Sequence, residues 1–171
     1  MKPHPHDPPE DEDDGWDSQW KDAAWLRSTN ADTPSSSRHV RTRQEALENN
    51  VITVVNQTRA NHGLNGLVTD ERLRTAARAH SHDMATRRYL AHLSPEGITP
   101  HARMLAAGCA HPAAENVALH EPNALLVVRA WMNSPGHRVN ILHPLFRTIG
   151  VGVFLQTSPR VAWWTQNFGY A

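Results

Sequence analysis

Two segments near the C-terminus alternate with a period of two, and this alternation constrains the fold more than any other feature. In 148–155, TIGVGVFL, the apolar residues Ile149, Val151 and Val153 share one face. The segment 161–170, VAWWTQNFGY, alternates in the same way. Helix-like segments come before these two strands, and this order favours an α+β fold with an antiparallel sheet.

The longest helical patterns lie directly after the N-terminal region. From Gln44 onward, apolar residues follow an i, i+4, i+7, i+8 rhythm, and Gly63 stands where a residue in the left-handed conformation would end that helix. A loop, LNGLV, comes next. A second helix then follows, with Thr69 as its expected N-cap and His80 on its buried stripe. We expect His80 to be a core histidine with its hydrogen bonds satisfied.

Shorter elements fill the middle of the chain. HARMLAAG predicts one short helix that ends at Gly108, and AENVAL is a candidate strand. NALLVVRAWMN predicts an amphipathic helix with Asn123 as its cap. Helices and strands therefore continue through to the C-terminus.

Residues 1–43 differ in composition from everything that follows. They are rich in proline, acidic residues and serine, and they hold few apolar groups to offset the entropy of ordering. Trp16, Trp20 and Trp25 are the exception, because they fit a short amphipathic helix that docks on a protein partner. The alternative is a transient helix with exposed tryptophans. We expect a disordered tail over 1–43 and one folded domain over 45–171.

Charge and cysteine content exclude several classes of protein. Lys+Arg 17 balances Asp+Glu 17, so no overall field draws the chain to nucleic acid. No run of apolar residues reaches the length of a transmembrane helix. Cys109 is the single cysteine, which leaves no internal disulfide to stabilise the fold. The N-terminal residues contain no apolar core of a secretory signal.

Glu115 is the most informative polar residue. It lies in the apolar segment AENVAL, where a lone carboxylate is costly unless it is paired. Histidines are its natural partners, and Asn116 beside it could tie loops together through its amide. The alternative is an edge strand on which Glu115 points to water.

Two histidines stand at positions that suit chemistry. His92 lies in the turn-rich loop YLAHLSPEG, and loops carry site residues more often than helix interiors do. His137 follows Ser134 and Pro135, the expected N-cap and first residue of a new helix. The positive end of that helix dipole disfavours the imidazolium, so a neutral His137 could ligate a metal or accept a proton. The alternative is a histidine that caps its own helix or fills space. Because capping would occupy the Ser134 hydroxyl, Ser134 and His137 are not expected to act as nucleophile and base.

Six motifs follow one another along the chain: HGLNGLVTDERLRTAARAHSHDMA, YLAHLSPEGITPHAR, AENVA, WMNSPGHRVNIL, IGVGV and WTQNFG. Their order resembles that of the bacterial branch of the CAP superfamily, named after cysteine-rich secretory proteins, antigen 5 and pathogenesis-related 1 proteins. The resemblance covers residues 45 to 171. The resemblance implies an α-β-α sandwich, in which a small antiparallel sheet lies between helical layers beside an open cleft.

Many members of the superfamily place two histidines and two glutamates in that cleft, where they can bind zinc. By motif, His92 and His137 match the histidines and Glu115 matches one glutamate. Ser134 stands where the second glutamate normally lies, and Ala114 replaces the usual glycine before Glu115. With this incomplete set, we expect a divalent metal such as zinc to bind only weakly to His92 and His137, with Glu115 near and water completing the shell.

The resemblance implies a location outside the cell or in its envelope, but it does not fix one activity. The leading hypothesis is a non-catalytic binding module, in which His92, Glu115, Ser134 and His137 hold a small ligand, a lipid or a cell-envelope fragment. One alternative is a hydrolase in which Glu115, His92 and His137 activate water. Another is a structural or interaction domain whose tail tryptophans recruit a partner. The absence of an activated nucleophile and the incomplete ligand set count against an enzyme.

Overall fold

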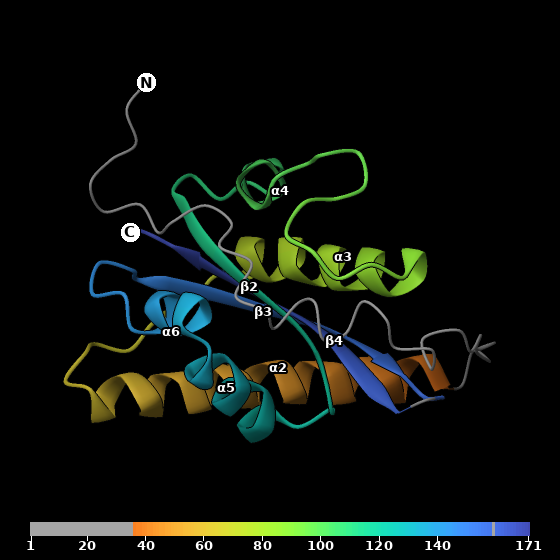
Figure 1. Ribbon diagram of the computed structural model, residues 1–171, viewed down its shortest axis with the longest axis horizontal. Coiled ribbons are helices and arrows are strands. Elements are labelled where there is room, and N and C mark those ends of the chain that lie inside the picture. The colour runs from red at the N-terminus through yellow and green to blue at the C-terminus, as the bar shows by residue number, and fades with distance from the viewer. Residues whose placement is uncertain (1–35, 159) are drawn as a thin grey trace.

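The protein is described by a computed structural model, in which residues 36–158 and 160–171 are placed (Figure 1). The expected tryptophan helix and the rest of the tail up to residue 35 lie outside these described residues. The elements, in chain order, are α2 (Ser36–Asn61), β1 (Val68–Thr69), α3 (Glu71–Arg87), α4 (Pro100–Ala106), β2 (Pro112–His120), α5 (Ala124–Asn133), α6 (Pro135–Ile141), β3 (Thr148–Gln156) and β4 (Val161–Gly169).

The ends of the first two helices differ in part from the sequence prediction. Helix α2 begins at Ser36, ahead of the expected start at Gln44, and Gly63 adopts the expected left-handed conformation just beyond its end (φ 71°). The N-cap of α3 is Asp70, whose Oδ1 accepts a hydrogen bond from the backbone N–H of Arg72 at 2.8 Å. Thr69 is not the cap because it belongs to β1, where it pairs with Ile149 of β3.

The sheet has four strands in the order β1-β3-β4-β2. Strand β4 pairs antiparallel with both β3 and β2, as the alternating segments predicted. Strand β1 is a parallel addition in a segment expected to be loop, which makes the sheet mixed. Its two residues, Val68 and Thr69, are too few to produce an alternating pattern in the sequence.

Helices cover both faces of the sheet, so the fold is an α+β, α-β-α sandwich (Figure 1). Helices α3 and α4 lie on one face, and α2, α5 and α6 lie on the other. The larger apolar core fills the second interface, where fully buried Val55 and Trp131 pack with Trp164 of β4. Burial of these side chains is the main apolar contribution to stability.

Helix α3 rests directly on the backbone of β3. A Cβ atom at Gly150 would lie 2.1 Å from the backbone N of Arg74, and one at Gly152 would lie 2.2 Å from that of Arg78. The alternation in β3 therefore has two purposes. Its valines face the larger core, and its glycines leave room for the helix on the other face.

Helix α2 protects the part of β3 that lies beyond the short β1 pairing. The Gln44 side chain donates to the Val153 carbonyl at 3.1 Å, and the Val153 N–H donates to Glu48 at 3.2 Å. These bonds satisfy backbone groups that an exposed edge would offer to another chain. Burial raises the pKa of the Glu48 carboxyl even though Arg78 donates hydrogen bonds to it.

Candidate functional site

Glu115 lies on β2, which is the last strand in the order of the sheet. Its side chain is only 1% exposed, so the alternative in which it points to water is wrong. It faces the layer formed by α3 and α4, because its contacts come from His80 of α3 and Arg103 of α4. The buried carboxylate predicted from the apolar context is therefore present and needs charge partners.

Arg103 and His92 supply those partners. Arg103 Nη2 donates to Glu115 Oε1 at 3.0 Å and to Oε2 at 2.9 Å, and His92 Nδ1 donates to Oε1 at 3.0 Å. Burial alone would raise the pKa of the Glu115 carboxyl. The hydrogen bond from His92 and the nearby positive charge of Arg103 act against burial, and this pKa lies below its ordinary value. Glu115 is thus held as a hydrogen-bonded carboxylate.

Arg103 also fixes the loop that carries His92. Its Nη2 donates to the His92 carbonyl at 2.8 Å, and its Nη1 donates to the Ile98 carbonyl at 2.9 Å. One guanidinium therefore joins α4, the loop and β2. The sequence did not distinguish Arg103 from other arginines. Its partner on β2, Glu115, belongs to another element, and a local sequence pattern does not show which elements meet.

His80 is a second residue that sequence reasoning did not place in the site. It is buried, as expected, and its Nε2 lies 2.9 Å from the Ala91 carbonyl and 3.9 Å from Glu115 Oε1. Because a carbonyl can only accept, Nε2 carries the proton. Burial lowers the pKa of His80, which favours this neutral form. The HSH pair at 80 and 82 was the available signal, but His82 is exposed and packs on Phe154.

Asn116, the next residue on β2, belongs to a separate hydrogen-bond network. Its Nδ2 donates to the His137 carbonyl at 3.2 Å and to Gln166 Oε1 at 2.9 Å. Asn140 of α6 donates to Asn116 Oδ1 at 2.9 Å. Adjacent residues of a strand face opposite sides of the sheet, so Asn116 is directed away from the layer that Glu115 faces. The Asn116 amide therefore ties β2 to α6 and β4, whereas the sequence had suggested that it ties loops together.

Ser134 and His137 form a close pair at the start of α6. The Arg138 N–H donates to the Ser134 carbonyl at 2.8 Å and Pro135 is the first helical residue, so the predicted helix start is correct. The Ser134 hydroxyl makes no capping bond and lies 2.9 Å from His137 Nδ1 instead. The prediction that capping occupies this hydroxyl is therefore wrong. The ring of His137, three residues on, takes the place of the usual backbone partner.

The four predicted site residues form two hydrogen-bonded pairs next to β2. One pair is His92 with Glu115, and the other is Ser134 with His137. Asn140 connects the second pair to β2, since its Nδ2 lies 3.4 Å from the Glu115 carbonyl. Strand β2 is therefore the structural centre of the candidate site.

The side chains expected to bind a metal, those of His92, His137 and Glu115, fit a metal ion only in part. Among residues 36–158 and 160–171, no group of three or more histidine, cysteine, aspartate or glutamate side chains is arranged to hold a metal ion. Both oxygens of Glu115 accept from Arg103, whose positive charge opposes a divalent cation at the same place. Glu115 is therefore unsuited as a ligand, and the zinc prediction depends on His92 and His137.

An α-β-α sandwich with imidazoles and a buried carboxylate along its edge strand is the arrangement of a CAP-type domain. The sequence profile described as "Cysteine-rich secretory protein family" matches residues 52–168. The chain belongs to this family.

Two proteins of Bacillus subtilis are similar in sequence. YkwD is 42% identical over 124 residues, which cover 72% of this chain and 47% of YkwD. The membrane protein YlbC is 30% identical over 126 residues, which cover 73% of this chain and 35% of YlbC. The chain thus spans less than half the length of these curated relatives.

Solved structures share the fold. An extracellular protein with an SCP domain from Bacillus anthracis aligns with a TM-score of 0.71 and 28% identity, over 84% of this chain and 45% of that chain. An outer surface protein of Borrelia burgdorferi aligns with a TM-score of 0.61 and 19% identity, over 84% of this chain and 98% of that chain. In the described part of this chain, no helix combines the length and apolar character needed to cross a membrane.

Proposed function

We propose that the chain is a non-catalytic binding module in which His92, Glu115, Ser134 and His137 line a cleft for a small ligand, a lipid or a cell-envelope fragment. The hydrogen bonding of Glu115 carries this proposal. Its carboxylate accepts from Arg103 and His92 and has a lowered pKa, whereas a general base works best with a pKa near the operating pH. Fixed and mutually bonded polar groups are better suited to recognition than to proton transfer.

We further propose that the module acts outside the cell or in its envelope. Support comes from the names of its structural relatives, one an extracellular protein and another an outer surface protein. A ligand in that compartment would be a small molecule, a lipid or a fragment of the envelope itself.

A serine hydrolase, which differs from the alternative in which Glu115, His92 and His137 activate water, would rest on the 2.9 Å contact between Ser134 Oγ and His137 Nδ1. A serine next to a histidine is the starting point of nucleophilic catalysis. A serine hydrolase also needs donors aimed at a developing oxyanion. Under this alternative, Ser134→Ala would abolish hydrolysis of an activated ester such as p-nitrophenyl acetate. Under the binding proposal, no esterase activity depends on Ser134.

Co-sedimentation of the full chain with purified peptidoglycan sacculi, and separately with phosphatidylglycerol vesicles, tests the binding function. We expect one of the two to retain the protein, and His92→Ala and His137→Ala to reduce retention. His62→Ala is the matched control, because His62 is exposed and its Nδ1 lies 2.8 Å from the Thr58 carbonyl of α2. Equal retention of all variants, or retention by neither material, would refute the proposed cleft.

Weak zinc binding is proposed as an additional property of the two imidazoles. Titration calorimetry should give weaker binding for His92→Ala and for His137→Ala than for the unaltered chain. Glu115→Gln should leave the zinc affinity nearly unchanged, because Arg103 already occupies that carboxylate. The same zinc affinity in the unaltered chain and the His92→Ala, His137→Ala double variant would eliminate the metal and leave a hydrogen-bonded pocket.

A further inference from the structure

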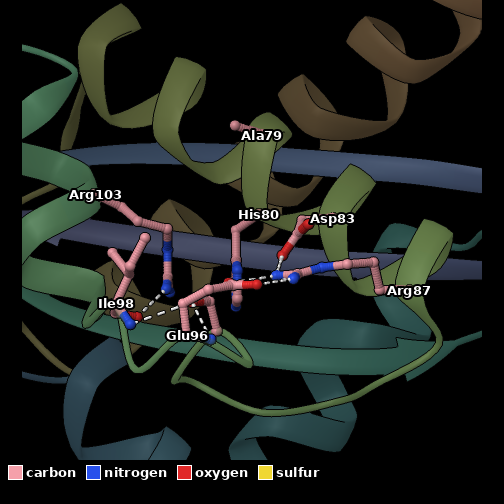
Figure 2. Close-up of a pocket in the computed structure, with 8 residues that line it drawn as sticks. Ala79, His80, Asp83, Arg87, Glu96, Ile98 and Arg103 are labelled. Atoms are coloured by element: carbon pink, nitrogen blue, oxygen red, sulfur yellow. Dashed lines mark hydrogen bonds and ion pairs between the residues drawn. The ribbon is translucent and has the colours of Figure 1, made fainter.

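A pocket of about 460 Å³ opens beside the Glu115 site, on the side of α3 (Figure 2). This volume falls within the range of small-molecule sites. Figure 2 shows side chains from α3, α4 and the loop between them converging on it. The lining residues are Ala79, His80, Asp83, Arg87, Ser94, Glu96, Ile98 and Arg103.

Two nitrogen atoms of the pocket residues have no hydrogen-bond partner within the described part of the chain. His80 is 1% exposed, and its Nδ1 is buried and unpartnered. Because Nε2 donates to the Ala91 carbonyl, Nδ1 is an acceptor. Arg103 Nε is likewise buried and unpartnered, and it is always a donor. Two residues of the pocket lining therefore carry one unused acceptor and one unused donor, both hidden from solvent, and each is costly to leave unsatisfied.

Each charged side chain that lines the pocket already has a partner of opposite charge. Arg87 bonds Asp83 at 2.8 Å and also forms an ion pair with Glu96, and Arg103 is paired with Glu115. No unpaired charge in the lining is left to attract an ion. Ile98, which is 48% exposed, adds an apolar surface at the rim.

We propose that this pocket binds a neutral, hydroxyl-rich ligand, a saccharide, through His80 Nδ1 and Arg103 Nε. A hydroxyl group donates one hydrogen bond and accepts others, so saccharide hydroxyls match both unpartnered atoms. The apolar C–H face of a sugar ring fits against Ile98. This inference rests on the proposed binding function and names its ligand class, but it uses side chains other than the two histidines tested above.

The ion pair between Arg87 and Glu96 lines the same pocket as His80. Since His80 Nδ1 is hidden from solvent, side chains of the lining have to move before a ligand reaches it. We expect this ion pair to be the part of the lining that opens. The two side chains are 35% and 56% exposed, and exposed ion pairs of this kind are weak enough to open readily.

Nitrogen NMR of the full chain tests the proposal directly. Titration with N-acetylglucosamine should shift the His80 Nδ1 resonance, while the charged sugars glucosamine and glucuronate should shift it less at equal concentration. His80→Leu should weaken binding of N-acetylglucosamine by about tenfold. His82→Ala, an exposed histidine on the same helix, should leave it unchanged. Arg87→Gln should strengthen binding by roughly two- to fivefold because it opens the ion pair.

The outcomes separate this proposal from the broader function. A sugar that shifts the resonances of His92 or His137 but not of His80 would overturn this pocket and leave the binding function standing. Charged sugars that bind as well as the neutral one would overturn the ligand class. A His80 resonance that responds to no sugar would overturn the inference even if His80→Leu does not fold, and the sacculus and vesicle assays would still decide the proposed function.

Discussion

Single side chains around β2 are held by hydrogen-bond partners, some distant in the sequence and some close to them. Glu115 is bonded from the loop by His92 and from α4 by Arg103. His137 is bonded to Ser134, three residues earlier in sequence. In each case the imidazole is oriented through Nδ1.

Ser134→Ala should separate the orienting role of the hydroxyl from helix capping. Removing the partner of a buried imidazole should lower the free energy of unfolding by about 1 kcal/mol in urea denaturation. The ring nitrogen resonances of His137 should also shift, because the hydroxyl no longer selects one tautomer. A simple cap would not affect the ring, and the hydroxyl makes no capping bond here.

Asn133→Ala is the matched control for that measurement, since Asn133 is an exposed neighbour at the end of α5. It should leave the His137 resonances in place. Unaltered His137 resonances in Ser134→Ala would contradict the assignment of an orienting role.

Glu115→Gln should make the free energy of unfolding depend less on pH in the acidic range. The pKa of Glu115 in the folded chain lies below the ordinary value of 4.5. Its ionised form therefore adds stability above the unfolded pKa, and this contribution is lost as the pH falls through the folded pKa. Urea unfolding between about pH 6 and pH 3 should give a smaller loss of stability for Glu115→Gln than for the unaltered chain.

The same substitution removes the charge partner of Arg103, so at neutral pH the variant should be destabilised by about 3–5 kcal/mol. Glu121→Gln, at an exposed position one residue beyond β2, serves as the control for the loss of one negative charge. If Glu115→Gln and the unaltered chain lost stability in parallel on acidification, the lowered pKa would be wrong.

At the scale of elements, the contact between α3 and β3 sets the position of His80 and thus the geometry near Glu115. Gly152→Ala places a methyl group where the backbone N of Arg78 lies 2.2 Å away, so α3 must move outward. Overpacking of this kind typically costs about 1–3 kcal/mol, and we expect at least that loss in thermal or urea unfolding. We also expect the His80 resonances to shift as the helix moves.

Gly66→Ala is the control for the glycine substitution. Its Cβ would meet Asn56 at 3.5 Å, which is an ordinary contact, so stability should change little. Equal stability of Gly152→Ala and Gly66→Ala would mean that α3 does not rest on the β3 backbone.

At the scale of the whole molecule, α2 both covers one layer of the sandwich and closes the edge of β3. The boundary expected from composition, at residue 45, falls within this helix, just after Gln44. The Gln44 side chain donates to the Val153 carbonyl, so the domain uses a residue that precedes its expected start at residue 45.

Two truncated chains test this boundary. A chain of residues 36–171 should unfold cooperatively with nearly the stability of the full chain. A chain of residues 45–171 should be less stable by about 1 kcal/mol or more in urea unfolding, because it loses the Gln44 hydrogen bond and the first turns of α2. Equal stability of the two truncated chains would place the boundary at residue 45 after all.

The sequence alone determined the elements whose signals are local and repeated. The period of two in β3 and β4 identified both strands, because each has one face in the larger core. The start of α6 followed from Ser134 and Pro135, whose backbone preferences act within one turn. Glu115 was also recognisable, since a carboxylate in an apolar segment must find a partner wherever the chain places it.

Only the tertiary structure decided which side chains meet. Arg103 pairs with Glu115, and His80 lies near Glu115 as well. These side chains meet because α3 packs directly against the glycines of β3. The Ser134 hydroxyl contacts a ring nitrogen of His137 and not a backbone N–H. Strand β1 pairs with β3 through only two residues. Local patterns report which face of an element is buried. Pairing across elements depends on how closely their backbones approach, and that distance is set only when the whole domain packs.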